Sequence, residues 1–161
     1  MGLGVLKTAN GDNYEGQWKD DKIEGKGIFV RHNGDRYEGQ WVDNKIEGKG
    51  KSIQVNGDVY DGQWQNNMRH GKGKLIWKDG DRYEGQWFEN NRHGQGKFYS
   101  KKGDIYDGQW QNDKRHGEGY KVYQNNDTYK GSWRKDHKHG HGVYKFVNGD
   151  LYEGQFHKNC I

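Results

Sequence analysis

The sequence predicts an all-β fold, a single-layer twisted antiparallel meander of seven β-hairpins with no helices. Seven tyrosines stand 23 residues apart, and the 161 residues equal seven such repeats. All 27 glycines fall in four columns of the same repeat. A fixed short period indicates one small structural unit stacked along a line. We therefore expect one domain over residues 1–161, with repeats centred on Tyr14, Tyr37, Tyr60, Tyr83, Tyr106, Tyr129 and Tyr152.

Each repeat is predicted to be one hairpin. In residues 25–41, two β-prone runs flank Asn33-Gly34. Asn-Gly and Asp-Gly tolerate the positive φ that tight hairpin turns require. The pattern leaves open whether the turn has two or three residues. The inward face of the first strand is therefore open as well, because a one-residue slip moves every side chain to the other face.

The second strand of each hairpin has a clear two-residue period. It places Tyr37, Gly39 and Trp41 on one face, and Glu38 and Gln40 on the other. We expect Gly39 to leave room for a ring from a neighbouring strand. A connection of four to five residues, such as residues 20–24, is then expected to lead to the next G-x-G pair. Stacked hairpins should advance about 10 Å per repeat and accumulate twist.

Composition narrows the class of protein. Mean hydropathy is −1.47, which leans toward disorder, but the net charge is only +4 and aromatic residues make up 14%. Rings can supply buried area that aliphatic residues do not, so we expect a folded chain with a thin core. The sequence contains no block of like charge, so it does not indicate nucleic-acid binding. No apolar run is long enough to cross a membrane. One cysteine, Cys160, fits a reducing compartment and a cytoplasmic location.

The repeat has the form Y-x-G-x-W … G-x-G … G-D. It appears as residues 37–41, then Gly48-Lys49-Gly50, then Gly57-Asp58. This pattern resembles the MORN repeat family over essentially the whole chain. Departures are Phe156 for the last Trp, Asn126 for a turn glycine and Lys130 for a column acid. The resemblance implies a single-layer array of twisted hairpins. It also implies protein–protein scaffolding in cytoskeletal, ciliary or junctional assemblies, and the family name records an early idea of membrane binding.

The aromatic column is the first candidate binding surface. Its rings should hold successive hairpins together, and a single-layer sheet should also leave one ring face uncovered. We expect that face to form a groove for a helix or an extended peptide of a partner protein, because aromatic rings are typical interface anchors. The predicted partner-binding residues are Tyr37, Trp41, Tyr60, Trp64, Tyr83, Trp87, Tyr106, Trp110, Tyr129 and Trp133.

Other columns offer weaker candidates for chemistry. The column aspartates, such as Asp35, are expected to bond nearby backbone N–H groups in turns. Equivalent residues of adjacent repeats lie about 10 Å apart, too far to share a metal. This argument applies to the histidine column as well (His70, His93, His116 and His139). His137, His139 and His141 could weakly bind a divalent ion, although a solvated face is the simpler interpretation. We therefore expect no metal, no cofactor, no catalytic residue and no enzyme.

The leading functional hypothesis is a non-enzymatic interaction scaffold in a cytoskeletal or ciliary (axonemal) assembly. Open sheet edges near residues 2–8 and 151–156 could also pair with a second copy or another chain. The alternative is a peripheral membrane module that binds anionic phospholipid or phosphoinositide. The lipid-facing residues would then be the basic column Arg69, Arg92, Arg115 and Lys138.

Overall fold

The structure is a computed structural model that describes residues 2–160. Those residues contain no helix, and hence none that could span a membrane. The strand order in the sheet is the chain order, which confirms the predicted antiparallel meander of seven hairpins. The strands are β1 (Gly2–Lys7), β2 (Asn13–Lys19), β3 (Lys22–Val30), β4 (Arg36–Val42), β5 (Lys45–Ile53), β6 (Val59–Gln65), β7 (Met68–Ile76), β8 (Arg82–Phe88), β9 (Asn91–Tyr99), β10 (Ile105–Gln111), β11 (Lys114–Val122), β12 (Thr128–Arg134), β13 (His137–Lys145) and β14 (Leu151–Phe156).

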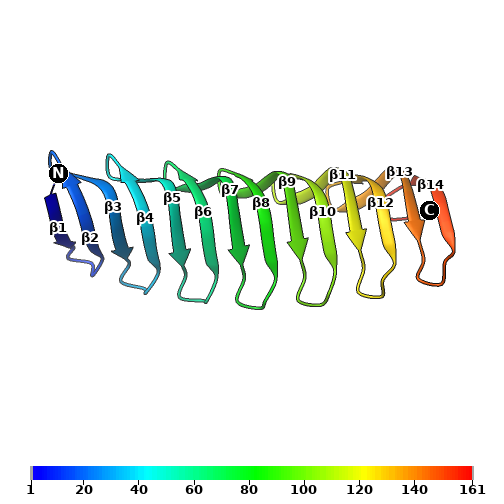
Figure 1. The fold of residues 1–161 in the computed structure, drawn as a ribbon, viewed down its shortest axis with the longest axis horizontal. Coiled ribbons are helices and arrows are strands. Elements are labelled where there is room, and N and C mark those ends of the chain that lie inside the picture. The colour runs from blue at the N-terminus through cyan, green and yellow to red at the C-terminus, as the bar shows by residue number, and fades with distance from the viewer. Residues whose placement is uncertain (1, 161) are drawn as a thin grey trace. The chain divides into compact units, whose positions relative to one another are not determined.

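The chain divides into two compact units, Met1–Lys78 and Asp79–Ile161. We call them the N-terminal unit, with β1 to β7, and the C-terminal unit, with β8 to β14. Within each unit the strands follow one another in chain order, with one kind of turn at each end of the strands (Figure 1). The single domain expected over residues 1–161 stays a prediction.

The turn that contains the column glycine is a three-residue loop. Arg31 N–H donates to the carbonyl of Asp35 over 2.8 Å, and Gly34 N–H donates to the carbonyl of Arg31 over 2.9 Å. Gly34 has a φ of 95°, the left-handed position that such loops require of their last residue. This length places Phe29 opposite Tyr37 on the inner face, and it places Ile28 opposite Glu38 on the outer face. The inward face that the sequence left open is thereby settled.

The connection between repeats is shorter than expected. It is a two-residue turn, and residues 22–24 already belong to β3 rather than to a loop. Both turn residues have positive φ, as in the type I′ turns whose twist matches that of the strands. Asp43 has 53° and Asn44 has 65°. The turn pairs are Asp20-Asp21, Asp43-Asn44, Asn66-Asn67, Glu89-Asn90, Asn112-Asp113, Lys135-Asp136 and Lys158-Asn159.

A β-bulge shapes the nine-residue strand that follows each two-residue turn. Gly39 pairs with Gly50, but Trp41 pairs with Ile46, so one residue of β4 opposes three residues of β5. The extra residues include Gly48 at a φ of 72°, a conformation that costs glycine little. Bulges of this kind bend a strand and increase its twist. The same register shift recurs between β10 and β11 and between β12 and β13.

The core of each repeat is an interlocked pair of rings. The Tyr37 hydroxyl donates to the carbonyl of Gln40 over 3.1 Å. A Cβ at Gly39 or Gly50 would collide with the Tyr37 ring, so these glycines make room for the tyrosine of their own repeat. The prediction of a ring from a neighbouring strand was wrong. The neighbouring repeat instead contributes Trp64, whose ring meets the Tyr37 ring edge to face at 5.3 Å.

Candidate interaction surface

The predicted aromatic groove is absent as an exposed surface. Nine of its ten rings are between 0% and 5% exposed, and Trp64 is half-buried. The Tyr106 ring lies between two indoles, Trp110 at 5.2 Å and Trp133 at 5.3 Å, and the Tyr129 ring lies between Trp133 and Phe156. Burial raises the pKa of the Tyr129 hydroxyl to about 12, as expected for a phenol removed from water. The rings hold the repeats together, and the expectation that they also offer open faces was wrong.

The basic column does not face outward as the lipid hypothesis requires. The Arg92 guanidinium lies 4.3 Å from the centroid of the Trp110 ring, and its Nε lies 3.1 Å from Asp113 Oδ1. Arg115 repeats this arrangement with Trp133 at 4.6 Å and Asp136 at 3.0 Å. These arginines are engaged within the fold by cation–π contacts and ion pairs.

The other two members of the basic column also lie over rings. The Arg69 guanidinium is 5.8 Å from the centroid of the Tyr60 ring. The Lys138 ammonium is 4.5 Å from the Tyr144 ring and 5.1 Å from the Phe156 ring. Burial, helped by the charge of Lys121, lowers the pKa of Lys138. The column as a whole is therefore a component of the packed face rather than a membrane-facing patch.

The column aspartates bond to turn N–H groups, as expected, but the N–H group belongs to the following repeat. Asp35 Oδ1 accepts from Val55 N–H over 2.9 Å, and Asp127 Oδ1 accepts from Val147 N–H over 2.8 Å. The Val55 N–H and the Asn33 amide lower the pKa of Asp35, because both favour the ionised carboxylate. This column joins one repeat to the next.

The histidines form no metal site in the part of the chain that the structure describes, where no group of three ligand side chains comes together. His137 Nδ1 lies 2.8 Å from the side-chain nitrogen of Asn159, and the His139 ring lies 5.6 Å from the His157 ring. The weak divalent-ion site considered for His137, His139 and His141 therefore finds no support. His137 instead contacts a turn residue of the next repeat.

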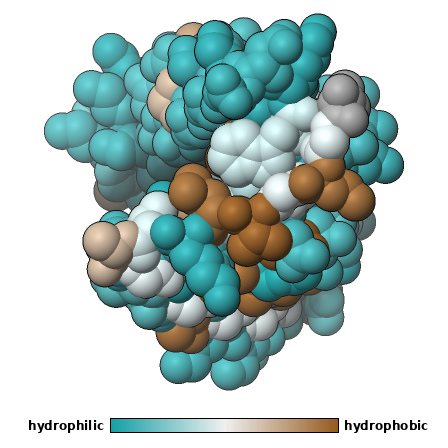
Figure 2. Space-filling model, turned by 90° about the vertical axis from the view of Figure 1, so that its left-hand side faces the viewer, coloured by the Kyte–Doolittle hydropathy of each residue, from teal (hydrophilic) through white to brown (hydrophobic). Residues whose placement is uncertain are grey.

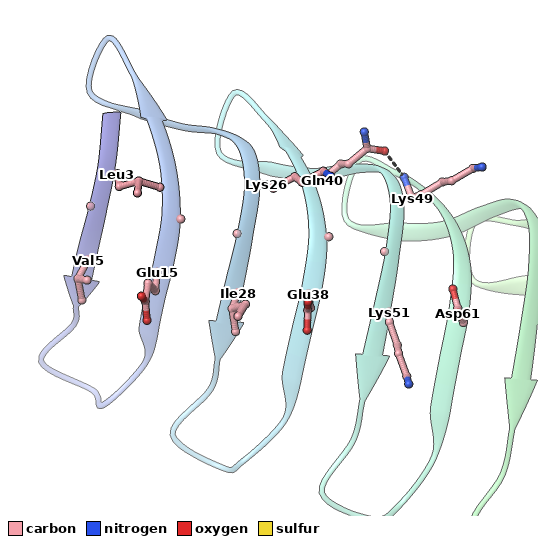
Figure 3. A pocket seen from close by; sticks show the side chains of 15 residues that line it. Leu3, Val5, Glu15, Lys26, Ile28, Glu38, Gln40, Lys49, Lys51 and Asp61 are labelled. Atoms are coloured by element: carbon pink, nitrogen blue, oxygen red, sulfur yellow. Dashed lines mark hydrogen bonds between the residues drawn. The ribbon is translucent and has the colours of Figure 1, made fainter. Parts of the chain in front are cut away.

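The outer face of the N-terminal unit carries a groove of ≈ 980 Å³ across β1 to β6. Glycine backbone forms its floor, since Gly16, Gly27 and Gly39 carry no side chain and the rings over them lie on the inner face. Figure 3 shows the side chains standing on either side of this floor. The groove-wall residues are Leu3, Val5, Glu15, Lys26, Ile28, Glu38, Gln40, Lys49, Lys51 and Asp61.

The groove changes character along its length. At the β1 end its walls are aliphatic, with Leu3 87% exposed and Val5 62% exposed. Toward β6 the walls carry charges of both signs, as where Lys51 stands opposite Glu38 on one side and Asp61 on the other. None of these side chains takes part in the packing of the rings. They form an open surface that the N-terminal unit offers to a ligand chain.

Sequence reasoning missed one column that supports this groove. Gln40 Oε1 accepts from Lys49 N–H over 2.6 Å, which satisfies a donor at the bulge (Figure 3). Gln17, Gln63, Gln86 and Gln109 bond in the same way to the next strand. The signal was present, because the residue before the column Trp or Phe is Gln in every repeat except at Ser132. A polar residue repeated so regularly indicates a structural hydrogen bond.

The comparisons with known proteins agree with the fold. The SAS-4 (dCPAP) TCP domain of Drosophila melanogaster, solved with a proline-rich motif of Ana2 (dSTIL), has a TM-score of 0.54 at 12% identity. That likeness covers 96% of this chain and 90% of the SAS-4 chain. The TCP10 domain of Danio rerio CPAP has a TM-score of 0.47 at 11% identity, over 96% of this chain and 68% of the CPAP chain. No curated protein matches the sequence. The MORN repeat model matches six times in tandem, over residues 14–36, 37–59, 60–82, 83–105, 106–128 and 129–151, and the chain therefore belongs to the MORN repeat family.

Proposed function

We propose that the chain is a non-enzymatic scaffold that binds an extended segment of another protein in the groove across β1 to β6. The observation that carries this proposal is the separation of the two faces. The rings that stabilise the fold are buried on the inner face. The groove on the outer face is lined by side chains that stand outside this ring packing, although Gln40 also accepts the Lys49 N–H. A partner could therefore bind there without disturbing the packing between repeats.

The dimensions of the groove suit an extended chain. Six strands span five inter-strand spacings of about 4.8 Å, or about 24 Å. A polyproline II segment rises about 3.1 Å per residue, so about eight residues would cross the groove. The glycine floor admits a backbone closely, and Leu3, Val5 and Ile28 offer aliphatic contacts at one end. An extended segment with apolar residues at that end fits this surface better than a rigid helix.

The comparison with SAS-4 supports a proline-rich ligand. That domain shares the fold and was solved in complex with a proline-rich motif of another protein. Proline-rich segments are already extended, so they lose little conformational entropy on binding. A cytoskeletal or ciliary (axonemal) assembly remains the setting we propose, on the strength of the family resemblance. We do not propose phosphoinositide binding, because the basic column is engaged within the fold.

Fluorescence anisotropy with a panel of labelled synthetic peptides tests the proposal. The panel contains proline-rich peptides and scrambled, proline-free peptides of equal charge. We expect Ile28→Asp and Lys49→Glu to weaken binding of the proline-rich peptides at least tenfold. Val147→Asp is the control for Ile28→Asp, because Val147 is an exposed aliphatic residue outside the groove. Circular dichroism melts establish that each variant is folded.

Two results would contradict the proposal. The first is unchanged affinity in folded groove variants, which would place the peptide elsewhere. The second is equal binding of proline-rich and scrambled peptides, which would remove the assignment of ligand class.

A further inference from the structure

The first and last strands of the described sheet are of complementary types within the repeat. β1 has one strand neighbour, β2, and β14 has one strand neighbour, β13. By sequence, β14 is the Y-x-G-x-F strand of a hairpin pair, and β1 is the G-x-G strand. Between these two strand types the chain elsewhere forms a fixed register, as where β2 pairs with β3. The two outer strands are therefore the two strand types that pair with each other elsewhere in the chain.

The outer strands also leave apolar and aromatic surface uncovered. On β1, Leu3, Val5 and Leu6 are exposed, and Figure 2 shows hydrophobic side chains gathered at this end. On β14, the Tyr152 ring is half-buried, whereas the other six column tyrosines are at most 4% exposed. Among the described residues, β14 is the last strand, and no strand lies over the Tyr152 ring there. Long exposed edges of this kind are templates for pairing with another chain.

We propose that β14 of one copy pairs antiparallel with β1 of a second copy, in the register that β2 and β3 adopt within one chain. In that register Glu15 opposes Ile28 and Gly16 opposes Gly27. The equivalent pairs between copies are Glu153 with Val5 of the next copy and Gly154 with Gly4 of the next copy. Neither glycine carries a side chain, so the Tyr152 ring could lie across both, as Tyr14 lies across Gly16 and Gly27.

Three contacts within the chain indicate what this interface would contain. Gln17 Oε1 accepts from Lys26 N–H over 2.7 Å, and the equivalent bond joins Gln155 to Leu3 N–H. Asp12 Oδ1 accepts from His32 N–H over 2.9 Å, and the equivalent bond joins Asp150 to Ala9 N–H. The Tyr14 ring meets the Trp41 ring at 5.4 Å, and the equivalent contact covers Tyr152 with Trp18. Trp18 Nε1 is buried without a hydrogen-bond partner, so this end of the sheet is incompletely packed.

Such a contact is heterologous, because it joins two different surfaces of the same chain. Heterologous contacts either close into a ring or continue as a filament. The assembly shares Leu3 and Val5 with the groove, so the β1 variants alter both surfaces. Glu153→Pro blocks the other edge and leaves every groove-wall residue in place, so it separates self-association from peptide binding.

Proline substitution can block each edge without removing a hydrogen bond that the fold uses. Lys26 N–H points toward β2, so by two-residue alternation Ile28 N–H does as well. Their equivalents Leu3 and Val5 then point their N–H groups out of the sheet. Glu153, the equivalent of Glu15, does the same at the other edge. Proline is tolerated at such positions of edge strands, and it prevents a further strand from pairing.

The test is analytical ultracentrifugation of the purified chain from micromolar to millimolar concentration. We expect the mass of the wild type to rise at least twofold, and Val5→Pro and Glu153→Pro to stay monomeric. An equimolar mixture of these two variants should form a dimer and nothing larger, because each retains one complementary edge. Val5→Ala keeps the N–H group and should still assemble. Circular dichroism of each variant verifies folding, and Leu3→Lys with Val5→Lys is a second block that retains every backbone N–H.

Several outcomes would overturn the proposal. They are a wild type that remains monomeric throughout, a mixture of the two proline variants that stays monomeric, and a loss of assembly in Val5→Ala equal to that in Val5→Pro. The last result would show that the apolar patch, rather than strand pairing, drives association.

Discussion

The first repeats of the N-terminal unit and the repeats of the C-terminal unit use the same backbone but fill one interior position with different chemistry. The second residue after the two-residue turn is aliphatic in β3 and β5, where Ile46 packs against the core cluster beside Tyr37 and Trp41, whereas Arg69 already occupies this position in β7. In the C-terminal unit the equivalent residue is Arg92, which lies over the Trp110 ring and pairs with Asp113. Both choices cover the indole. One does so by apolar contact, and the other by a cation–π contact with a carboxylate that balances the charge.

This comparison distinguishes the residue columns that define the repeat from the interior position whose residue type varies. In both units the same tyrosine, glycine, aspartate and tryptophan columns make the same contacts. The turn residue differs between these two pairs, because Asn67 accepts the backbone N–H of Ile46, whereas Asp113 accepts both the backbone N–H and the side chain of Arg92. The next repeat supplies an opposite charge for Arg92 and Arg115, whereas an asparagine stands at the same turn position after Arg69 and Lys138.

The glycines beneath the tyrosine rings should show the largest effect, and it should be equal in the two units. Gly50→Ala and Gly96→Ala would each place a Cβ against the ring of Tyr37 or Tyr83. We expect each to lower the free energy of unfolding by about 3 kcal/mol, at the upper end of overpacking costs. Urea denaturation measures this. Gly2→Ala is the matched control, because nothing lies within 4 Å of a Cβ there. A small cost at Gly50 or Gly96 would mean that the rings do not lie on the glycines.

Exchanging the interior residue of one unit for that of the other should reveal a coupling energy between this residue and the turn residue of the next repeat. Ile46→Arg places a cation beside the neutral Asn67, and we expect a loss of about 2 kcal/mol from the lost aliphatic burial and the unpaired charge. Adding Asn67→Asp should restore about half of that loss, because it recreates the pair seen between Arg92 and Asp113. The reverse exchange, Arg92→Ile with Asp113→Asn, should change stability by less than about 1 kcal/mol. A double-mutant cycle with no coupling energy would break the comparison.

The glutamine column should show a smaller effect. Gln40→Ala leaves the Lys49 N–H without its acceptor at the bulge, and we expect a loss of about 1 kcal/mol in thermal or urea melts. Ser132 occupies the same column in the C-terminal unit and bonds instead to Glu118 over 2.6 Å. Ser132→Ala, which removes no acceptor from a bulge N–H, is therefore the control and should cost less. Equal costs would show that Gln40 is not needed at the bulge.

Titration of a column aspartate should have the smallest effect on stability. Bonds to Val55 N–H and Asn33 lower the pKa of Asp35, so its contribution is present above the unfolded value of about 3.9 and is lost as the pH falls through the folded value. Asp35→Asn keeps an acceptor but does not titrate. We expect this variant to lose less stability than the wild type between about pH 6 and about pH 3. Identical pH profiles in urea melts would contradict the assignment.

Asp104 allows the same substitution to be compared in the C-terminal unit. Burial raises its pKa, but the Lys121 ammonium and the Gln124 N–H lower it by more, so the net direction is again downward. Lys121 lies 2.8 Å away and is largely buried. Asp104→Asn should therefore cost more stability at neutral pH than Asp35→Asn, because it leaves the lysine without a carboxylate. Equal costs at neutral pH would show that the ion pair adds nothing.

The sequence predicted the hairpins because their signals are local. Asn33-Gly34 marks a turn, and the alternation of Tyr37 and Trp41 marks an inner face. The two-residue turns were missed because they lack glycine, although Asn and Asp are the residues that most readily adopt positive φ there. Ring burial was missed for a different reason. The bend at Gly48 and the cover from Trp64 of the next repeat depend on tertiary packing, which no local signal in the sequence encodes.

Hydroxyl-radical footprinting read by mass spectrometry tests most directly the claim that the rings are internal and the outer face is free. Tyr106 and Tyr120 form a matched pair in the C-terminal unit, because they are the same residue type at 2% and 43% exposure. We predict that Tyr120 is modified many times faster than Tyr106 in the native protein, and that the two rates converge in denaturant. Equal rates in the native protein would contradict the separation of a ring-bearing inner face from a free outer face.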